Sequence, residues 1–234
     1  MIQIFVGYDP RESAVYHVLT QSIMNTATVP VSIAPLHSPM LDNFDGQQDG
    51  TNAFIYSRFL VPSLMEFNGW ALFVDSDMLV RTDIKKLWDM RDDSKAAMVV
   101  KHDYKTKFPR KFIGTPLESR NESYPRKNWS SMTLWNCGHP ANRILSRKFV
   151  AEAGGRILHR FDWLQDELIG EIPKSWNWLV GEYEFNLFAD LVHFTIGAPA
   201  LPYYEKCDYS AEWFNTQLDV NHIIGNVEPQ RRTA

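Results

Sequence analysis

One short stretch, residues 70–80 (WALFVDSDMLV), constrains the fold of this chain more than any other. It opens with an apolar run, residues 71–74, that is too short for a helix and is typical of a buried parallel strand. Asp75 and Asp77 follow at once, and two carboxylates so close to a buried strand end repel each other and lose hydration. A divalent cation such as Mg²⁺ or Mn²⁺ relieves both costs. The carboxyl end of a strand is also where open α/β sheets bind their ligands.

The same two acids have a simpler explanation. Asp is common in loops, so Asp75 could cap a turn while Asp77 is merely solvated. The buried strand that precedes them favours a functional role. A D-x-D sequence by itself does not decide between the two explanations.

Composition narrows the class of protein. The chain has 234 residues, 44% hydrophobic and 22% charged, which predicts one folded domain over residues 1–225 with a C-terminal tail at 226–234. A net charge of −4 argues against a nucleic-acid-binding protein. Two cysteines do not make a disulfide framework, and the N-terminus resembles neither a signal peptide nor a membrane anchor. We therefore expect a cytoplasmic location and no transmembrane segment.

The remaining patterns alternate between strands and helices. Strands are expected at residues 2–6, 31–36, 96–100, 132–135 and 191–195, and helices at 10–24, 52–64, 84–90, 141–153 and 163–169. This order predicts an α/β fold with a Rossmann-like, mixed but mostly parallel sheet flanked by helices. The polar residues 37–52 are interpreted as a mobile loop.

The turn after the first strand can serve two purposes. Asp9, Pro10 and Glu12 match an N-cap, a proline at the first helical position and a capping-box glutamate. A strand-turn-helix start also places Gly7, Tyr8 and Asp9 at the ligand edge of the sheet. Asp9 can be a cap, a ligand contact, or both.

Residues 101–128 form a basic insertion, in which eight lysines and arginines stand against three acids. A solvated loop is the default interpretation. The alternative is a flap over an anionic ligand, in which case neutralising Lys105, Lys107 and Lys111 would weaken ligand binding.

The order of these pieces resembles the family 8 glycosyltransferases, which have the GT-A fold. The resemblance rests on residues 4–9 (IFVGYD), 56–62 (YSRFLVP), 73–80 (FVDSDMLV), 84–88 (IKKLW), 135–138 (WNCG), 165–167 (QDE) and 193–197 (HFTIG). It implies a retaining transfer of a hexose from a nucleotide sugar, with a UDP-sugar as the expected donor. The acceptor would be a hydroxyl of a glycan or another molecule, and Mn²⁺ or Mg²⁺ would be required.

The resemblance also implies roles for individual residues. The metal ligands would be Asp75, Asp77 and His193. The residues that would hold the nucleotide are Gly7, Tyr8, Asp9, Asp75 and Ser76, with Gly197 next to the diphosphate. The catalytic and sugar-binding residues would be Arg58, Asn136, Gln165 and Asp166. A lone histidine near an apolar strand is more often structural, so the ligand role of His193 depends on the resemblance.

One part of the family pattern is missing. A lysine is expected shortly after Gly197, where this chain has Ala198, Pro199 and Ala200. Lys206 or a lysine of residues 101–128 could replace it. The route to retention stays open: either Asp166 attacks first, or the acceptor enters on the face that the diphosphate leaves.

Three other classes of protein fit less well. A haloacid-dehalogenase-type phosphatase would place D-x-D near the start of the chain, with Thr or Val where Leu79 stands. A nucleotidyltransferase would carry a Gly-rich basic loop after the first strand, where this chain has only Arg11. A catalytically degenerate nucleotide-sugar-binding module is compatible with the altered residues 165–167.

Overall fold

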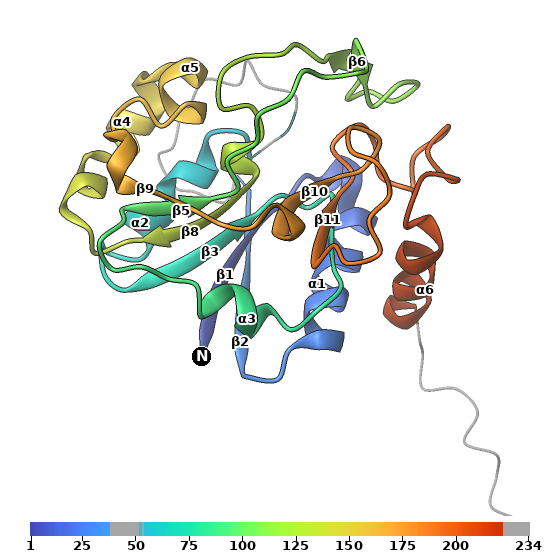
Figure 1. Cartoon of the computed structure of the whole chain (residues 1–234), viewed down its shortest axis with the longest axis horizontal. Helices are drawn as coiled ribbons and strands as arrows, with labels where there is room; N and C mark the ends of the chain where they lie inside the picture. Colours follow the sequence, from blue (N-terminus) through green and yellow to red (C-terminus); the bar gives the residue numbers. More distant parts are fainter. Residues whose placement is uncertain (38–51, 53, 222–234) are drawn as a thin grey trace, which may run out of the picture.

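The structure is a computed structural model that describes residues 1–37, 52 and 54–221. Its central feature is a sheet of six strands in the order β2-β1-β3-β8-β5-β9 within those residues (Figure 1). The strands are β1 (Ile2–Gly7), β2 (Val31–Leu36), β3 (Trp70–Val74), β5 (Ala97–Val99), β8 (Met132–Asn136) and β9 (Ile169–Glu171). Only β8 runs against its neighbours, so the sheet is mixed and mostly parallel, as predicted.

A smaller sheet continues from the end of β3. It contains β10 (Trp178–Leu179), β11 (Leu191–His193) and β4 (Met78–Val80), in that order. The chain passes from β3 in the large sheet to β4 in the small sheet through residues 75–77 alone. The D-x-D sequence is therefore the junction between the two sheets.

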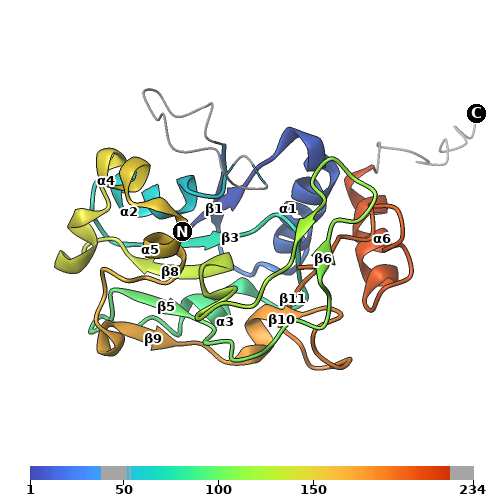
Figure 2. The same cartoon turned by 90° about the horizontal axis from the view of Figure 1, so that it is seen from above.

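Helices cover both faces of the large sheet. They are α1 (Ser13–Thr26), α2 (Val61–Leu64), α3 (Ile84–Trp88), α4 (Arg147–Glu152), α5 (Gly154–His159) and α6 (Ser210–Val220). Strand side chains alternate between the faces. Phe5, Phe73 and Trp135 pack with residues of α2, α4 and α5. Ile4 and Val74 lie in the core that contains residues of α1 and α3. Seen from above, α6 lies on the outer side of α1, where Trp213 is buried (Figure 2).

Three predicted helices are wrong in extent. The helix expected at 52–64 starts only at residue 57, as a 3₁₀ turn followed by α2. Pro62 lies in the first turn of α2, where its missing N–H removes no helical hydrogen bond. The helix expected at 141–153 is a 3₁₀ turn (Pro140–Ile144) followed by α4. Gly154, at φ +68, starts α5 directly after it. The helix expected at 163–169 is a single 3₁₀ turn (Asp166–Leu168).

The basic insertion is partly ordered. It forms a short antiparallel hairpin of β6 (Arg110–Lys111) and β7 (Ser119–Arg120), which lies beyond the carboxyl edge of the large sheet (Figure 1). The predicted mobile loop lies, except for residues 37 and 52, outside the described residues, as does the tail at 226–234. Among the described helices, none combines the length and apolar character needed to cross a bilayer.

Candidate active site

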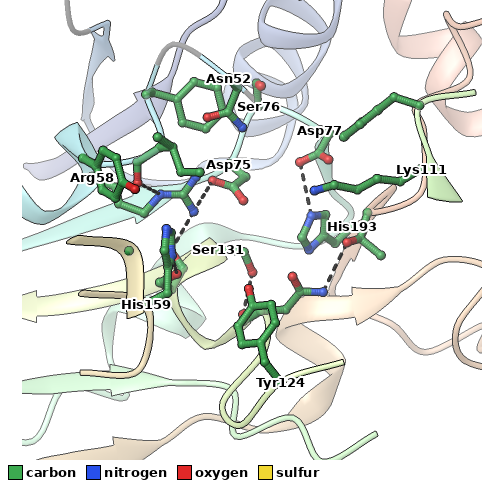
Figure 3. Close-up of a pocket in the computed structure, with 18 of the residues that line it drawn as sticks. Asn52, Arg58, Asp75, Ser76, Asp77, Lys111, Tyr124, Ser131, His159 and His193 are labelled. Carbon is green, nitrogen blue, oxygen red and sulfur yellow. Dashed lines mark hydrogen bonds and ion pairs between the residues drawn. The ribbon is translucent and has the colours of Figure 1, made fainter. Parts of the chain in front are cut away.

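The junction between the sheets is held by backbone hydrogen bonds on both sides. The Asp75 N–H donates to the carbonyl of Ser131 at 2.8 Å, which prolongs the pairing of β3 with β8. The Phe194 N–H donates to the carbonyl of Asp77 at 2.8 Å, which prolongs the pairing of β4 with β11. Asp75 is therefore fixed to the large sheet and Asp77 to the small one. Both side chains point into the same pocket (Figure 3).

The register of the small sheet brings a histidine to these acids. His193 is paired with Met78, the residue next to Asp77. Its Nε2 lies 3.2 Å from Asp77 Oδ1, and one donor atom from each of Asp75, Asp77 and His193 lies within 4.8 Å of the others. Two carboxylate oxygens and one imidazole nitrogen are donors that Mn²⁺ accepts. The three side chains thus fit the metal site expected from the sequence.

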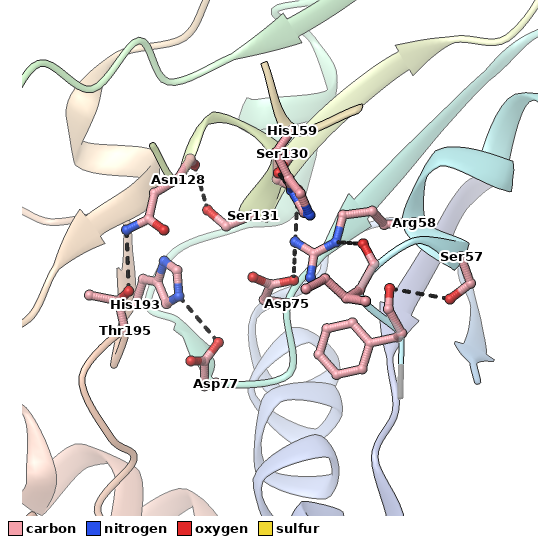
Figure 4. Close-up of polar contacts among 12 residues, drawn as sticks. Ser57, Arg58, Asp75, Asp77, Asn128, Ser130, Ser131, His159, His193 and Thr195 are labelled. Carbon is pink, nitrogen blue, oxygen red and sulfur yellow. Dashed lines mark hydrogen bonds and ion pairs between the residues drawn. The ribbon is translucent and has the colours of Figure 1, made fainter. Parts of the chain in front are cut away.

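A chain of hydrogen bonds fixes which nitrogen of His193 faces the acids. Ser131 Oγ donates to the Asn128 carbonyl at 2.7 Å (Figure 4) and accepts from Asn177 Nδ2 at 2.8 Å. The Asn177 oxygen therefore points to His193 Nδ1, 3.0 Å away. This order of donors and acceptors places a proton on Nδ1, so Nε2, which faces Asp77, is the nitrogen that can ligate a cation.

Arg58 is the buried partner of Asp75. Its Nη1 lies 2.8 Å from Asp75 Oδ1, and among the described residues its side chain also donates to the carbonyls of Ile55 and Ser130 (Figure 4). Its guanidinium carbon lies 5.1 Å from the centre of the Phe73 ring, which places the cation on an aromatic face. Arg58 thus acts on the first acid of the D-x-D sequence.

The two acids respond differently to their surroundings. Burial raises the pKa of Asp75 to about 6, although Arg58 opposes the rise. Burial also acts to raise the pKa of Asp77, but the charge and hydrogen bond of His193 and the charge of Lys111 more than offset it, so that pKa is lowered. Asp77 is consequently the acid that stays ionised most easily.

Lys111 of strand β6 brings a positive charge to the pocket. Its ammonium group points toward Asp77 and His193 (Figure 3), yet within the described chain it makes no hydrogen bond or ion pair. Burial lowers the pKa of Lys111, while the nearby Asp77 and Asp75 act in the opposite direction. A half-buried ammonium with no bonded partner, beside a metal site, is suited to an anionic ligand.

Glu12 is a further pocket residue, and the sequence pattern had assigned it only to a capping box. Its side chain is buried, and its Oε1 has no hydrogen-bond partner among the described residues. Burial, with Asp77 and Asp9 nearby, raises the pKa of Glu12 to about 8. The cap itself comes from Asp9, which accepts from the Arg11 N–H at 3.0 Å.

The pocket has a volume of about 440 Å³, and two chemically different groups of residues line it. The first group is the one described above, with the acids, His193 and Lys111. The second group comes from α5 and the residue after it, and consists of Arg156, His159 and Arg160. Burial lowers the pKa of His159 to about 3, so this imidazole is neutral, and its Nδ1 lies 2.8 Å from Ser130 Oγ. Arg156 and Arg160 form no ion pair within the described residues.

Some of the expected site residues lie away from this pocket. Asn136 pairs with Trp70 at the far end of β3, and its amide donates to the Lys95 carbonyl at 3.0 Å. Because β8 runs antiparallel, its carboxyl end is at the edge opposite the D-x-D sequence, which corrects the expectation that Asn136 lines the sugar subsite. Gln165 and Asp166 are exposed and do not line the pocket, and Asp166 pairs with Arg126.

Gly7, Tyr8 and Asp9, which were expected to hold the nucleotide, lie at the carboxyl edge of the large sheet but do not line the pocket. Val6 is paired with Val74, so Gly7, Tyr8 and Asp9 leave β1 beside Asp75. Packing explains why residue 7 is a glycine, since a Cβ at this position would lie 2.4 Å from the Phe54 ring. Tyr8 packs edge-on against Tyr16, with ring centres 5.1 Å apart, and Asp9 is buried.

Two further expected residues are also placed. Ser76 is buried in the pocket wall between the two acids. Gly197 packs so tightly on Tyr204 that a Cβ there would lie 2.6 Å from its ring. Lys206, one candidate for the missing lysine, is exposed and outside the pocket, whereas Lys111 lies inside it.

A mostly parallel sheet whose carboxyl edge carries a D-x-D loop beside a small second sheet defines a glycosyltransferase of the GT-A type. The model of glycosyl transferase family 8 matches residues 12–138, and the chain belongs to this family. It is therefore a transferase enzyme whose activity is glycosyl transfer.

Individual relatives agree with this assignment. Protein CDI of Arabidopsis thaliana is 43% identical over 94% of this chain and 87% of its own length. The galactosyltransferase LgtC, solved with donor and acceptor sugar analogues, superposes over 95% of this chain and 97% of its own, with a TM-score of 0.60 and 12% identity. The chain spans about half the length, 52%, of the bifunctional glycosyltransferase WbbM (93% of this chain, TM-score 0.55, 12% identity). These two structures bear on the fold alone.

Proposed function

We propose that this enzyme is a metal-dependent, retaining glycosyltransferase that moves a hexose from a UDP-sugar to an acceptor hydroxyl. The observation that carries the proposal is the set of Asp75, Asp77 and His193, whose donor atoms lie within 4.8 Å of one another at the carboxyl edge of the sheet. An unbonded lysine beside them adds the positive charge that a diphosphate needs.

Each residue has a distinct task. Asp75, Asp77 and His193 would hold Mn²⁺ or Mg²⁺, which when bound would neutralise the charge that develops on the diphosphate as the glycosidic bond breaks. Arg58 keeps Asp75 ionised and fixes its carboxylate at 2.8 Å. Lys111 would bind the diphosphate, replacing the lysine expected after Gly197.

The two groups of pocket residues suggest how the substrates are arranged. The nucleoside would lie toward Gly7, Tyr8 and Asp9, which leave β1 next to the D-x-D loop. The sugar and the acceptor would then lie next to Arg156 and His159. A neutral His159, with an unpartnered Nε2 among the described residues, can hydrogen-bond a sugar hydroxyl.

The positions of the carboxylates favour one route to retention. Asp166, the candidate for attack on the sugar, is exposed and paired with Arg126. Of the carboxylates that line the pocket, Asp75 and Asp77 belong to the proposed metal site, Glu12 is buried next to them, and Glu122 is exposed. We therefore propose that the acceptor hydroxyl enters on the face that the diphosphate leaves, without an attacking carboxylate.

A cytoplasmic location is part of the same proposal. Cys137 and Cys207 are both free thiols. Unpaired thiols are the usual state in a reducing compartment, which supports this location.

The first experiment measures UDP binding by calorimetry with and without Mn²⁺. The wild-type chain is expected to bind UDP only with the metal, and Asp77→Ala is expected to abolish binding. Asp89→Ala is the matched control, because Asp89 is exposed and forms its one ion pair within the described residues with Lys85. Undiminished UDP binding by Asp77→Ala would refute the metal site.

A second experiment asks whether the chain turns over a donor. Slow hydrolysis of UDP-sugars, measured over a panel of donors without acceptor, is expected for a transferase and identifies the sugar. UDP binding with no hydrolysis of any donor would favour a nucleotide-sugar-binding module instead. The observation that favours the binding module is that Gln165 and Asp166, which were expected to be catalytic, are exposed.

A further inference from the structure

The hairpin that carries Lys111 cannot hold its own position. Strands β6 and β7 contain two residues each, paired as Arg110 with Arg120 and Lys111 with Ser119, and one flanking backbone bond, from the Asn121 N–H to the Pro109 carbonyl at 2.9 Å, prolongs this ladder. A two-stranded ribbon of this size is at best marginally stable in water. Phe112, directly after Lys111, has φ +54, a conformation that a bulky residue keeps only when its surroundings enforce it.

The enforcing contacts come from residues 196–204, the segment that follows β11. The Phe112 N–H donates to the Ile196 carbonyl at 2.7 Å, and the Ile113 N–H donates to the Tyr204 hydroxyl at 3.1 Å. Both donors lie within two residues of Lys111. The Tyr204 hydroxyl is thus the side-chain atom of this segment that bonds the backbone next to Lys111, whereas the Phe112 carbonyl accepts from the Thr115 hydroxyl at 2.8 Å within the hairpin's own turn.

Tyr204 reaches this position because residue 197 has no side chain. A Cβ on Gly197 would lie 2.6 Å from ring carbons of Tyr204, a distance that no packed structure tolerates. The neighbouring Tyr203 packs on Gly114 in a similar way, with a Cβ there 2.8 Å from its ring. The hairpin and the segment 196–204 therefore interlock.

We propose that Tyr204 is a positioning residue for Lys111, and that its hydroxyl holds the hairpin so that the Lys111 ammonium faces the diphosphate site. This inference rests on the proposed function, in which Lys111 binds the diphosphate. In this arrangement the segment 196–204 acts indirectly, because its Tyr204 positions Lys111 of the hairpin. Gly197 serves this arrangement by making room for the Tyr204 ring.

The test is a double-mutant cycle on UDP affinity, measured by calorimetry with saturating Mn²⁺. Lys111→Ala is expected to weaken UDP binding about 10- to 100-fold, because a charge-assisted contact is lost. Tyr204→Phe, which removes only the hydroxyl, is expected to weaken it about 3- to 10-fold. In the Lys111→Ala background Tyr204→Phe is expected to have no further effect, because the two residues act through the same contact.

Two controls separate positioning from a general structural role. Tyr203→Phe removes the hydroxyl of the adjacent tyrosine, which makes no hydrogen bond within the described residues, and is expected to leave UDP affinity within twofold of wild type. Uridine, which has no phosphate, is expected to bind wild type and Tyr204→Phe equally. Gly197→Ala is a second route to the same loss, since its Cβ must displace the Tyr204 ring.

The outcomes are distinguishable. Wild-type UDP affinity in Tyr204→Phe, or an equal loss in the Lys111→Ala background, would overturn the inference while leaving the proposed function in place. An equal loss of uridine binding would also overturn it. No Mn²⁺-dependent UDP binding by the wild-type chain would overturn the inference and the proposed function together.

Discussion

Asn177 offers the sharpest test of the proposed metal site, because among the three proposed ligands it hydrogen-bonds only His193 within the described residues. Its side chain is fully buried, and its Oδ1 lies 3.0 Å from His193 Nδ1. Asn177→Leu leaves that buried N–H without an acceptor and allows the imidazole to turn. The loss of one buried hydrogen bond amounts to about 1–3 kcal/mol.

That free energy sets the expected size of the effect. Since about 1.4 kcal/mol corresponds to a tenfold change, Mn²⁺ affinity should fall on the order of 10- to 100-fold in Asn177→Leu. Asn177→Asp keeps an acceptor opposite His193 Nδ1, so its Mn²⁺ affinity should stay within about threefold of wild type. Electron paramagnetic resonance of free Mn²⁺, with UDP present, measures both variants.

The control is a second buried asparagine. Asn142 is equally inaccessible, but its amide bonds the carbonyls of Ala96 and Asn136 at the opposite edge of the sheet. Asn142→Leu should therefore lower the unfolding temperature without changing Mn²⁺ affinity. Equal losses of Mn²⁺ affinity in Asn177→Leu and Asn177→Asp, or no loss in Asn177→Leu, would refute the orientation argument.

Three further predictions concern other pocket residues. Arg58→Met removes the cation that lowers the pKa of Asp75, so Mn²⁺-dependent UDP binding should weaken about tenfold at pH 6 and recover as pH rises; a loss independent of pH would contradict this. Burial raises the pKa of Glu12 from 4.5 to about 8, so the folded chain becomes less stable as the pH rises from 4.5 through 8 and the buried carboxyl group ionises. Glu12→Gln cannot ionise. This substitution should therefore raise the unfolding free energy on the order of 2–4 kcal/mol more at pH 9 than at pH 5, measured by urea titration. An equal gain at both pH values would show that Glu12 ionises freely. The double variant Arg156→Ala/Arg160→Ala should raise the KM for the acceptor and leave the affinity for UDP with Mn²⁺ unchanged. A weaker affinity for UDP with an unchanged KM for the acceptor would instead place the donor next to these two arginines.

The sequence was most informative where local chemistry and strand pattern agreed. Residues 71–77 predicted both a buried strand and acids at its carboxyl end, because an apolar run followed by two carboxylates has few structural solutions. His193 was expected only through the family resemblance, since its approach to Asp77 depends on the antiparallel register of β4 and β11.

The errors have a common origin in long-range geometry. Asn136 ends a strand, as predicted, but nothing local shows that β8 runs antiparallel and ends at the opposite edge. Lys111 was one of three lysines of the basic insertion expected to bind the ligand, and nothing in their sequence pattern shows that Lys111 alone of the three lines the pocket. Asn177 gave no signal, because a single asparagine between two tryptophans has no pattern from which a partner can be inferred.

The junction at residues 75–77 has a mechanical consequence. Asp75 belongs to the large sheet, whereas Asp77 and His193 belong to the small one. An ion shared by these side chains would cross-link the two sheets next to the core that they already share, so binding of the donor would stiffen β10 and β11 and its release would loosen them. Amide hydrogen exchange in those strands should then slow when Mn²⁺ and UDP are added, even at backbone positions that touch neither.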